Sequence, residues 1–365
     1  DLASRRDLSS SIMVVIKILR LVLFVSGIFF IIVRQNHLAM HCSKKFYIGV
    51  MLVSFLLSLI SNCNQFQQVL FHYDTTLALN AYLWRYGINT VVDAFFITVT
   101  ILIPSLAGEL LHYETSPQSK AGSFLHYIQS TFLSCHVAQL IVLGYFVCCI
   151  MLGIQSFLIK VGQAHFGVWV EHSWITSSSN AYLPFLAAFT FGYKTSFSEE
   201  IMYRLYAINL GKKFFNKLLP NTKRFNILIA CLLSAFIWGF AHSSYAIFPM
   251  WFRGLEVTCI GGFLAFVYLK FGLIPVIVGH YLFDVFWDSA GLIFGSTKPF
   301  YFYSALFILF LPLAIAGIAW FVSRPEEVRP LRWHLNKHQL YNLEILKAFL
   351  HANKDAYISK SQEQI

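Results

Sequence analysis

The sequence predicts an all-α protein, a polytopic transmembrane helical bundle of eight or nine membrane helices. Of its 365 residues, 57% are hydrophobic and 12% are charged, and the mean hydropathy is +0.63, a composition unlike that of a soluble domain. Apolar runs of about 17–25 residues, long enough to cross a bilayer, recur along the chain. More polar connections at 62–85 and 161–179 separate some of these runs.

Each apolar run predicts one membrane helix. The run at 11–33 is interrupted by Lys17 and Arg20, and it is longer than the core of a typical signal peptide. The run at 127–157 is long enough to tilt or to extend beyond the bilayer. The first runs are the ones least clearly defined by an unbroken series of apolar residues, so a bundle of eight membrane helices is the alternative to nine. The predicted spans are 11–33, 46–61, 86–108, 127–157, 181–209, 225–247, 250–270, 273–293 and 300–322.

Lysine and arginine residues in the short connections predict which helix ends face the cytoplasm. The strongest cluster lies at 212–224 and a second lies at 34–45. With nine spans, both clusters and the C-terminal tail fall on the cytoplasmic side, while Arg5 and Arg6 argue against the outside N-terminus that follows. The net charge of +10 is then explained by topology and by contact with anionic membrane lipids, and no nucleic-acid partner is expected.

Two adjacent carboxylates and an arginine lie in the run 181–209, where an isolated charge is costly to bury. In a helix, Glu200 and Arg204 stand four residues apart on one face and can form an ion pair. Glu199 is rotated by about 100° from Glu200, so it need not share that pair. The alternative is purely structural, a buried ion pair and an acid at a helix start, because Ser196 and Glu199 also fit a capping box.

Further polar residues interrupt the apolar runs in the second half of the chain. His242 lies in the run 225–247, and His280 and Asp284 lie four residues apart, on one helix face, in the run 273–293. A lone histidine in a membrane helix is more often a hydrogen-bonded structural residue than a catalyst. Polar positions on three separate helices are a stronger indication, because groups that are costly to bury need one another as partners. We therefore expect these side chains to converge.

Other ionisable residues lie in the apolar regions as well. Arg253 and Glu256 are three residues apart and are expected to form a structural pair. Asp93 and His136 have no partner that the sequence makes evident. Asp288 lies one turn beyond the aspartate of the His-x-x-x-Asp pair, so it could line the same cavity.

The three motifs, taken in order, resemble those of the CPBP intramembrane proteases, the family of the type II CAAX-prenyl endopeptidases and of bacterial bacteriocin-processing and immunity-type (Abi-like) proteins. Here they read Glu-Glu-x-x-x-Arg at 199–204, Trp-x-x-x-His at 238–242 and His-x-x-x-Asp at 280–284. The resemblance covers about 180–293. The family usually has phenylalanine where this chain has Trp238, an exchange that preserves an aromatic packing role.

The resemblance implies a catalytic core and a role for each motif. Glu199 and His242 would activate a water molecule for attack on a peptide carbonyl, and His280 and Asp284 would bind and stabilise the oxyanion. A carboxylate cannot donate a hydrogen bond unless it is protonated, so Asp284 is expected to orient His280 instead.

The remaining residues of the motifs have supporting roles. Glu200 and Arg204 would hold their helix in register, and Trp238 would pack against the site.

Zinc is the main mechanistic alternative. Glu199, His242 and His280 could ligate a catalytic zinc ion with an open water position. The chain lacks the His-Glu-x-x-His motif that the common zinc proteases carry on one helix, and its seven cysteines form no paired-cysteine metal motif. The resemblance favours a reaction that needs no cofactor.

The leading hypothesis is an intramembrane endopeptidase that cleaves a membrane-associated or lipidated peptide, with a prenylated CAAX-type tail as one candidate substrate. The alternatives are a non-proteolytic immunity or scaffold protein with the same fold, and a transporter that uses the buried charges as an ion path. Transporters of that kind have paired repeats, and none is visible here. The expected partners are membrane lipids and the anchored substrate, and a bacterial plasma membrane is favoured over the endoplasmic reticulum.

The chain divides into four predicted parts: an N-terminal transmembrane region of about four helices (1–179), the catalytic core (180–293), a last membrane helix (294–323) and a cytoplasmic tail (324–365) with a short amphipathic helix. From the predicted helix ends, Glu199 lies roughly 16 Å and His280 roughly 10 Å from the cytoplasmic ends of their helices. These distances predict a pocket in the middle to cytoplasmic half of the bundle.

Overall fold

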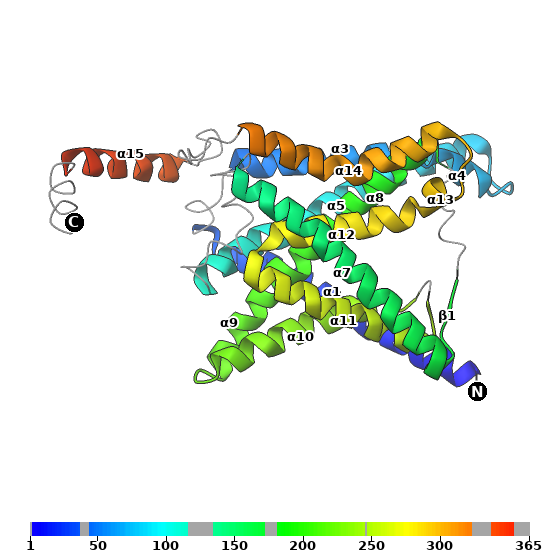
Figure 1. Cartoon of the computed structure of the whole chain (residues 1–365), viewed down its shortest axis with the longest axis horizontal. Coiled ribbons are helices and arrows are strands. Elements are labelled where there is room, and N and C mark those ends of the chain that lie inside the picture. Colours follow the sequence, from blue (N-terminus) through cyan, green and yellow to red (C-terminus); the bar gives the residue numbers. More distant parts are fainter. Residues whose placement is uncertain are drawn as a thin grey trace.

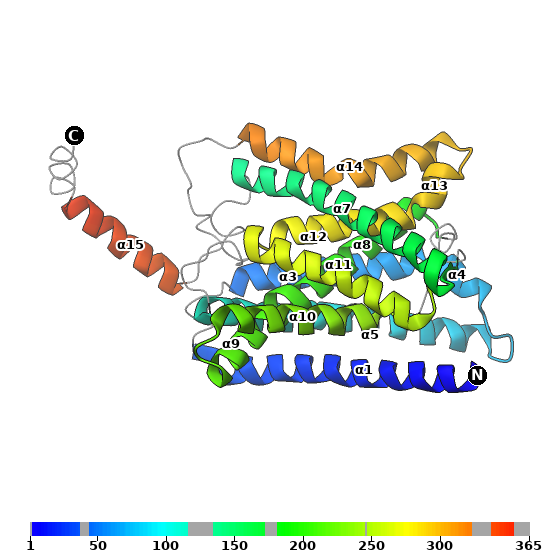
Figure 2. The same ribbon diagram turned by 60° about the horizontal axis from the view of Figure 1, so that its bottom comes forward.

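The computed structural model describes residues 2–36, 44–115, 134–171, 181–244, 247–322 and 337–353. Most helices run roughly lengthwise in an elongated bundle, and α15 lies beyond the end opposite the N-terminus (Figure 1 and Figure 2). The first half contains α1 (Leu2–Val33), α3 (Lys44–Asn64), α4 (Phe66–Phe71), α5 (Leu79–Thr115) and α7 (Cys135–Phe166). The second half contains α8 (Pro184–Glu200), the π-helix η2 (Ile201–Ala207), α9 (Ile208–Leu218), α10 (Lys223–Ala241), α11 (Met250–Phe271), α12 (Leu273–Asp288), α13 (Ala290–Phe294), α14 (Pro299–Val322) and α15 (Lys337–Ala352). Two short strands, β1 (Trp169–Val170) and β2 (Ile247–Phe248), form an antiparallel pair.

Seven of the described helices are long and apolar enough to cross a membrane, as expected of a multi-pass integral membrane protein. They are α1, α3, α5, α7, α10, α11 and α14. The other two predicted spans correspond to α8, which continues through η2 into α9, and to α12. With 17 and 16 residues, α8 and α12 are shorter than the about 20 residues that a membrane helix needs. Both nevertheless pass lengthwise between the other helices (Figure 2).

The ends of the helices differ from the predicted runs where local signals act. α7 begins at Cys135 because Ser134 caps it, accepting a hydrogen bond from the backbone N–H of Val137 at 3.2 Å. The helix continues to Phe166 and ends at Gly167, whose φ of 64° favours glycine. Residues 127–133 of that predicted run lie outside the described residues.

α12 is held close to its neighbours by small residues. It follows α11 after a single residue, Gly272, which has a φ of 87°. Gly279 faces α7, where an added Cβ would lie 2.9 Å from the Cβ of Val147. On α8, a Cβ added to Gly192 would lie 2.7 Å from Cγ2 of Val285. Side chains at either glycine would push these helices apart, so the glycines set the distance from α12 to α7 and to α8.

The helix that carries the two adjacent glutamates changes its hydrogen-bonding pattern directly after them. α8 ends at Glu200 and the π-helical segment η2 takes over at Ile201. Single π-helical turns within α-helices are frequent at functional sites. The sequence predicts one uninterrupted helix here, because no residue pattern distinguishes the wider turn.

The N-terminal region packs against α8 through polar contacts. Ser54 and Ser61 of α3 are both buried. Ser61 Oγ accepts hydrogen bonds from the Thr190 hydroxyl at 3.1 Å and from Lys194 Nζ at 2.9 Å, and Ser54 shares a 3.0 Å hydrogen bond with the Tyr193 hydroxyl. α3 thus fixes the rotation of the helix that presents the glutamates.

Candidate active site

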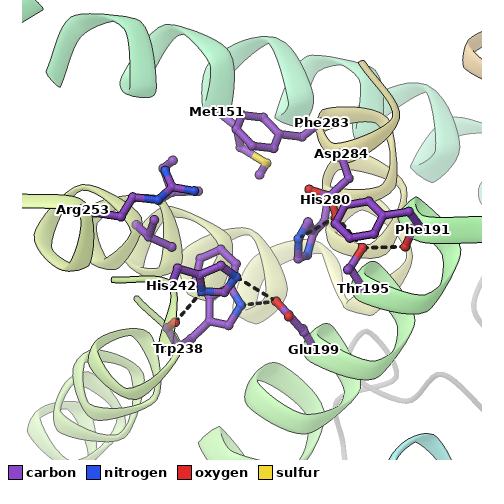
Figure 3. Close-up of a pocket in the computed structure, with 12 residues that line it drawn as sticks. Met151, Phe191, Thr195, Glu199, Trp238, His242, Arg253, His280, Phe283 and Asp284 are labelled. Atoms are coloured by element: carbon purple, nitrogen blue, oxygen red, sulfur yellow. Dashed lines mark hydrogen bonds and ion pairs between the residues drawn. The ribbon is translucent and has the colours of Figure 1, made fainter. Parts of the chain in front are cut away.

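A cavity of about 150 Å³ lies between five helices of the bundle. Polar side chains from α8, α10 and α12 point into it, and α11 adds Arg253 (Figure 3). The residues that line it are Met151, Phe191, Thr195, Glu199, Trp238, His242, Arg253, Val257, Ile260, His280, Phe283 and Asp284.

Glu199 and His242 meet at this cavity. Glu199 Oε2 lies 3.5 Å from His242 Nε2, and it also accepts a 2.5 Å hydrogen bond from the indole N–H of Trp238. The other ring nitrogen of His242, Nδ1, lies 2.7 Å from the backbone carbonyl oxygen of Trp238. Because a carbonyl oxygen only accepts, Nδ1 donates, and Nε2 is the nitrogen turned toward the carboxylate. The Glu199 side chain is 21% exposed and that of His242 is 15% exposed, so both reach the cavity.

His280 is held between two carboxylates. Its Nδ1 lies 2.7 Å from Glu200 Oε1, and its Nε2 lies 3.4 Å from Asp284 Oδ2, which also accepts from the Thr195 hydroxyl. Carboxylates only accept, so these contacts suit a ring that donates from both nitrogens. The sequence predicts that Asp284 orients His280, whereas the shorter contact comes from Glu200.

Glu200 and Arg204 lie behind the wall of the cavity, with side chains 0% and 1% exposed. Their ion pair, predicted from the four-residue spacing, is present, with Arg204 Nε 3.0 Å from Glu200 Oε2. The guanidinium carbon also lies 4.2 Å from the ring centroid of Trp238, a cation–π contact.

Trp238 contacts the polar groups of all three helices. Its ring packs edge-to-face with those of His242 and His280, at centroid distances of 5.1 and 5.5 Å. With its hydrogen bond to Glu199, it does more than the packing role predicted for it.

The structure brings the residues of the three motifs together, as expected from the cost of burying them singly. Five of the seven predicted site residues line the cavity, namely Glu199, Trp238, His242, His280 and Asp284. Glu200 and Arg204 contact these residues from behind, and Asp288 is not part of the lining. The chemical roles assigned to these residues stay predictions.

Two polar residues of the cavity were missed by sequence reasoning. Thr195 lies one helical turn before Glu199, so helix periodicity could have placed it on the same face. Arg253 does pair with Glu256, as predicted, with Nη1 2.5 Å from Oε2. The pairing concealed that the arginine also lines the cavity.

Glu199 lies farther from the lysine-rich connection at 212–224 than predicted. Glu199 is about 22 Å along the helix from Pro184 and about 28 Å from Leu218, because α8 continues through η2 into α9. His242 and Arg253 lie where α10 ends and α11 begins, at the opposite end of the bundle. The cavity therefore occupies the middle of the bundle, where His280 lies about 10 Å along α12 from Leu273 as predicted, and extends toward the end away from the lysines.

No group of three or more histidine, cysteine, aspartate or glutamate side chains in the described part of the chain is arranged to hold a metal ion. Glu199 approaches His242, but both ring nitrogens of His280 face other carboxylates.

Comparisons with known proteins agree with the resemblance of the motifs. Residues 180–286 match the family model described as type II CAAX prenyl endopeptidase Rce1-like. The sporulation-killing factor biosynthesis protein SkfC of Bacillus subtilis (strain 168) is 33% identical over 104 residues. That match covers 27% of this chain and 19% of SkfC, so the similarity spans about a fifth of the relative's length. No solved structure matches this chain.

Proposed function

We propose that this protein is an intramembrane endopeptidase that hydrolyses a peptide bond of a membrane-associated substrate without a metal ion. The observation that carries the proposal is the approach of Glu199 and His242 on one wall of a cavity that His280 also lines. The match of residues 180–286 to an endopeptidase family supports the same reaction class.

Glu199 and His242 are arranged to activate a water molecule. Glu199 Oε2 and His242 Nε2 are 3.5 Å apart, so one water can approach both from the cavity. Because His242 Nδ1 donates to the backbone, Nε2 of the neutral ring accepts, and the water donates one hydrogen to each group. The water oxygen then attacks the peptide carbonyl carbon as Glu199 takes a proton. General-base catalysis of this kind contributes about 10²–10⁴-fold to a rate.

His280 is placed to stabilise the oxyanion that forms on the carbonyl oxygen. Glu200 holds its Nδ1, which leaves Nε2 on the side of Asp284 and the cavity. A donor aimed at developing negative charge contributes about 10²–10³-fold in other hydrolases. As the C–N bond breaks, Glu199 returns its proton to the leaving amine. The products are a carboxylic acid and an amine, and a proton passes from the acid to the amine to give a carboxylate and an ammonium group.

We also propose that the lysine-rich end of the bundle faces the cytoplasm of a bacterial cell. This end, called the basic end below, carries Arg34, Lys44, Lys45, Lys212, Lys213, Lys217, Lys223, Arg224 and Lys270. The other end carries Arg5 and Arg6 near the start of α1, and Lys298 is the sole lysine or arginine of its described connections, 65–78, 167–171, 181–183, 242–244, 247–249 and 289–298. Short loops rich in lysine and arginine favour the cytoplasmic side, and the C-terminal end of α14 lies at the same end of the bundle (Figure 1).

This orientation has a consequence for the substrate. Buried apolar side chains, among them Leu205, Leu264 and Leu273, fill the space between the cavity and the basic end. The peptide therefore enters from the opposite end, where β1 and β2 pair, or from the lipid beside Phe191, which is 43% exposed. Peptides anchored in the outer half of the membrane fit this path better than a cytoplasmic prenylated tail.

Reconstituted protein tests the reaction. The purified protein is incubated in liposomes with membrane-anchored peptides, with prenylated peptides and with the precursor of a secreted peptide. Mass spectrometry identifies the two fragments of any peptide that is cleaved. Chelator is added in a parallel series, and protein-free liposomes are the control. We expect cleavage that survives chelation. Loss of cleavage with chelator, restored by zinc, contradicts the metal-free mechanism, and binding without cleavage supports the scaffold alternative.

The orientation is tested separately. Two variants are made in a background without the native cysteines, one with cysteine in place of Ser296 and one with cysteine in place of Asn221. Whole cells that contain each variant are treated with a membrane-impermeant thiol reagent. We expect labelling at Ser296 only, and labelling at Asn221 only contradicts the proposed orientation.

A further inference from the structure

Arg253 is a charged residue of the cavity that the proposed mechanism does not use. It is the fourth residue of α11 and is only 9% exposed, yet it lines the same cavity as Glu199 and His242. Figure 3 shows its guanidinium reaching the cavity from the α11 side, across from Thr195 and Phe191. It is the sole lysine or arginine among the residues that line this cavity.

The arginine is held in place from behind. Its Nη1 lies 2.5 Å from Oε2 of Glu256, whose side chain is 0% exposed. The other oxygen of Glu256 accepts a 3.3 Å hydrogen bond from Gln155 Nε2 on α7. The carboxylate is therefore fixed by two helices, and it fixes the direction of the guanidinium in turn. A side chain held in this way loses little freedom when it binds a ligand.

The chemistry of this end of the cavity favours an anion. A guanidinium carries five N–H donors in a planar fork, which matches the two oxygens of a carboxylate. The neighbouring lining residues Met151, Val257 and Ile260 are apolar, and charges attract more strongly where water is excluded. At the other end, Glu199 and Asp284 repel an anion. A substrate with a negative group therefore has one favourable direction in the cavity.

We propose that Arg253 binds a carboxylate of the substrate and so sets the direction in which the peptide lies across Glu199 and His242. This inference rests on the proposed peptidase function and adds a specificity residue to it. The carboxylate belongs either to the C-terminus of the peptide or to an acidic side chain near the cleaved bond.

Matched peptides test the proposal on the unaltered protein. One cleaved peptide is made with a free C-terminal carboxylate, with a C-terminal amide, and with each acidic side chain near the cleaved bond changed to its amide. We expect one of these neutral versions to raise KM about tenfold or more, the effect of losing one hydrogen bond to a charged group. Which version does so identifies the source of the carboxylate. Equal KM values for all versions overturn the proposal and leave the peptidase function standing.

Variants then assign the preference to Arg253. Arg253→Gln alone leaves the buried Glu256 without its cation, so the main variant is Arg253→Gln/Glu256→Gln, which removes both charges. We expect it to lose the preference for the acidic peptide through KM. Glu256→Gln alone keeps the arginine and an amide oxygen that can accept from it, so it should retain more of the preference than the double variant. The matched control Lys270→Gln, an exposed cation on the same helix, keeps the preference in full. A double variant that folds and still prefers the acidic peptide overturns the assignment.

A binding measurement separates failure of this proposal from failure of the peptidase function. The parent protein and the double variant are titrated with the acidic and neutral peptides under conditions that give no turnover. If no peptide is ever cut, the peptidase function fails, while tighter binding of the acidic peptide by the parent alone still supports Arg253 as its site. Equal binding by both proteins contradicts it.

Discussion

Glu199 and Glu200 are adjacent in the sequence but belong to two regions with different surroundings. The cavity region contains Glu199, which is 21% exposed and meets a histidine and an indole N–H. The region behind the cavity contains Glu200, which is 0% exposed and lies between Arg204 and His280. A carboxylate that reaches a cavity can exchange a proton with a substrate. A carboxylate that is enclosed by two hydrogen-bond donors instead holds those two side chains in position. Within one helical turn, Glu199 is therefore placed to react with a substrate and Glu200 is placed to support neighbouring side chains.

The same comparison explains why neither glutamate can replace the other. In a helix, successive residues point about 100° apart, so only one of the two can face the cavity. The π-helical segment that begins at Ile201 lies directly after this pair and carries Arg204 into the interior. Variants in each region should consequently fail in different measurements.

Apart from the loss of Glu199 itself, the largest effect is expected at the cavity, from His242→Gln. The variant removes the ring nitrogen that faces Glu199 and that we propose holds the attacking water, and we expect cleavage to slow about 10³-fold, within the range of general acid–base catalysis. The rate is measured on the peptide that the parent cuts. The matched control is His165→Gln, an exposed histidine in the last turn of α7. A comparable loss in the control would show that the effect is not specific to the cavity.

In the region behind the cavity, Glu200→Gln should act first on stability. It leaves the buried Arg204 without its carboxylate, which we expect to destabilise the fold by about 3–5 kcal/mol. Denaturant unfolding in detergent measures the change. The double variant Glu200→Gln/Arg204→Met removes both charges and should recover much of the loss. If Glu200→Gln unfolds like the parent, the pair does not hold this region.

Trp238 connects the two regions, and Trp238→Phe sharpens the comparison between them. Phenylalanine keeps an aromatic ring over Arg204 but cannot donate to Glu199. A hydrogen bond to a charged group contributes about 1.5–3 kcal/mol, so we expect cleavage to slow by about 10- to 100-fold. The unfolding midpoint should change little. A fully active Trp238→Phe would show that the hydrogen bond from the indole N–H to Glu199 does not contribute to cleavage.

The smallest effect is expected at Thr195→Val. The variant removes the hydroxyl that donates to Asp284 and keeps the size of the side chain. A single hydrogen bond of this kind contributes about 0.5–1.5 kcal/mol, so we expect a several-fold loss of kcat with KM unchanged. Thr100→Val in α5, whose hydroxyl donates to the backbone carbonyl of Ile97 in its own helix, is the matched control. A rise in KM alone would mean that Thr195 contacts the substrate instead of positioning Asp284.

The helices, and the convergence of the motif residues on one cavity, could be predicted from the sequence. Long apolar runs have few alternatives to membrane helices, and ionisable residues inside them must find partners. The ion pair of Glu200 with Arg204 follows from helix geometry alone and is present. The same argument yields the pairing of Arg253 with Glu256.

Contacts between helices could not be predicted in the same way. The hydrogen bond that His280 donates to Glu200 joins residues 80 positions apart, and it depends on the depth at which α8 and α12 cross. The donation from Trp238 to Glu199 depends on the rotation of α10. The predicted distance of Glu199 from the lysine-rich end of its helix was too short because the predicted helix did not include the continuation of α8 into α9.

The decisive experiment is cleavage by Glu199→Gln, measured beside the parent in the same liposomes, with the unfolding midpoint taken on the same preparations. Glutamine keeps the shape of the side chain and can still accept the Trp238 hydrogen bond, but it cannot take a proton from water. We predict a rate lower by about 10³-fold or more with an unchanged midpoint. Cleavage at the rate of the parent would contradict Glu199 as the base and would require another group to activate the water.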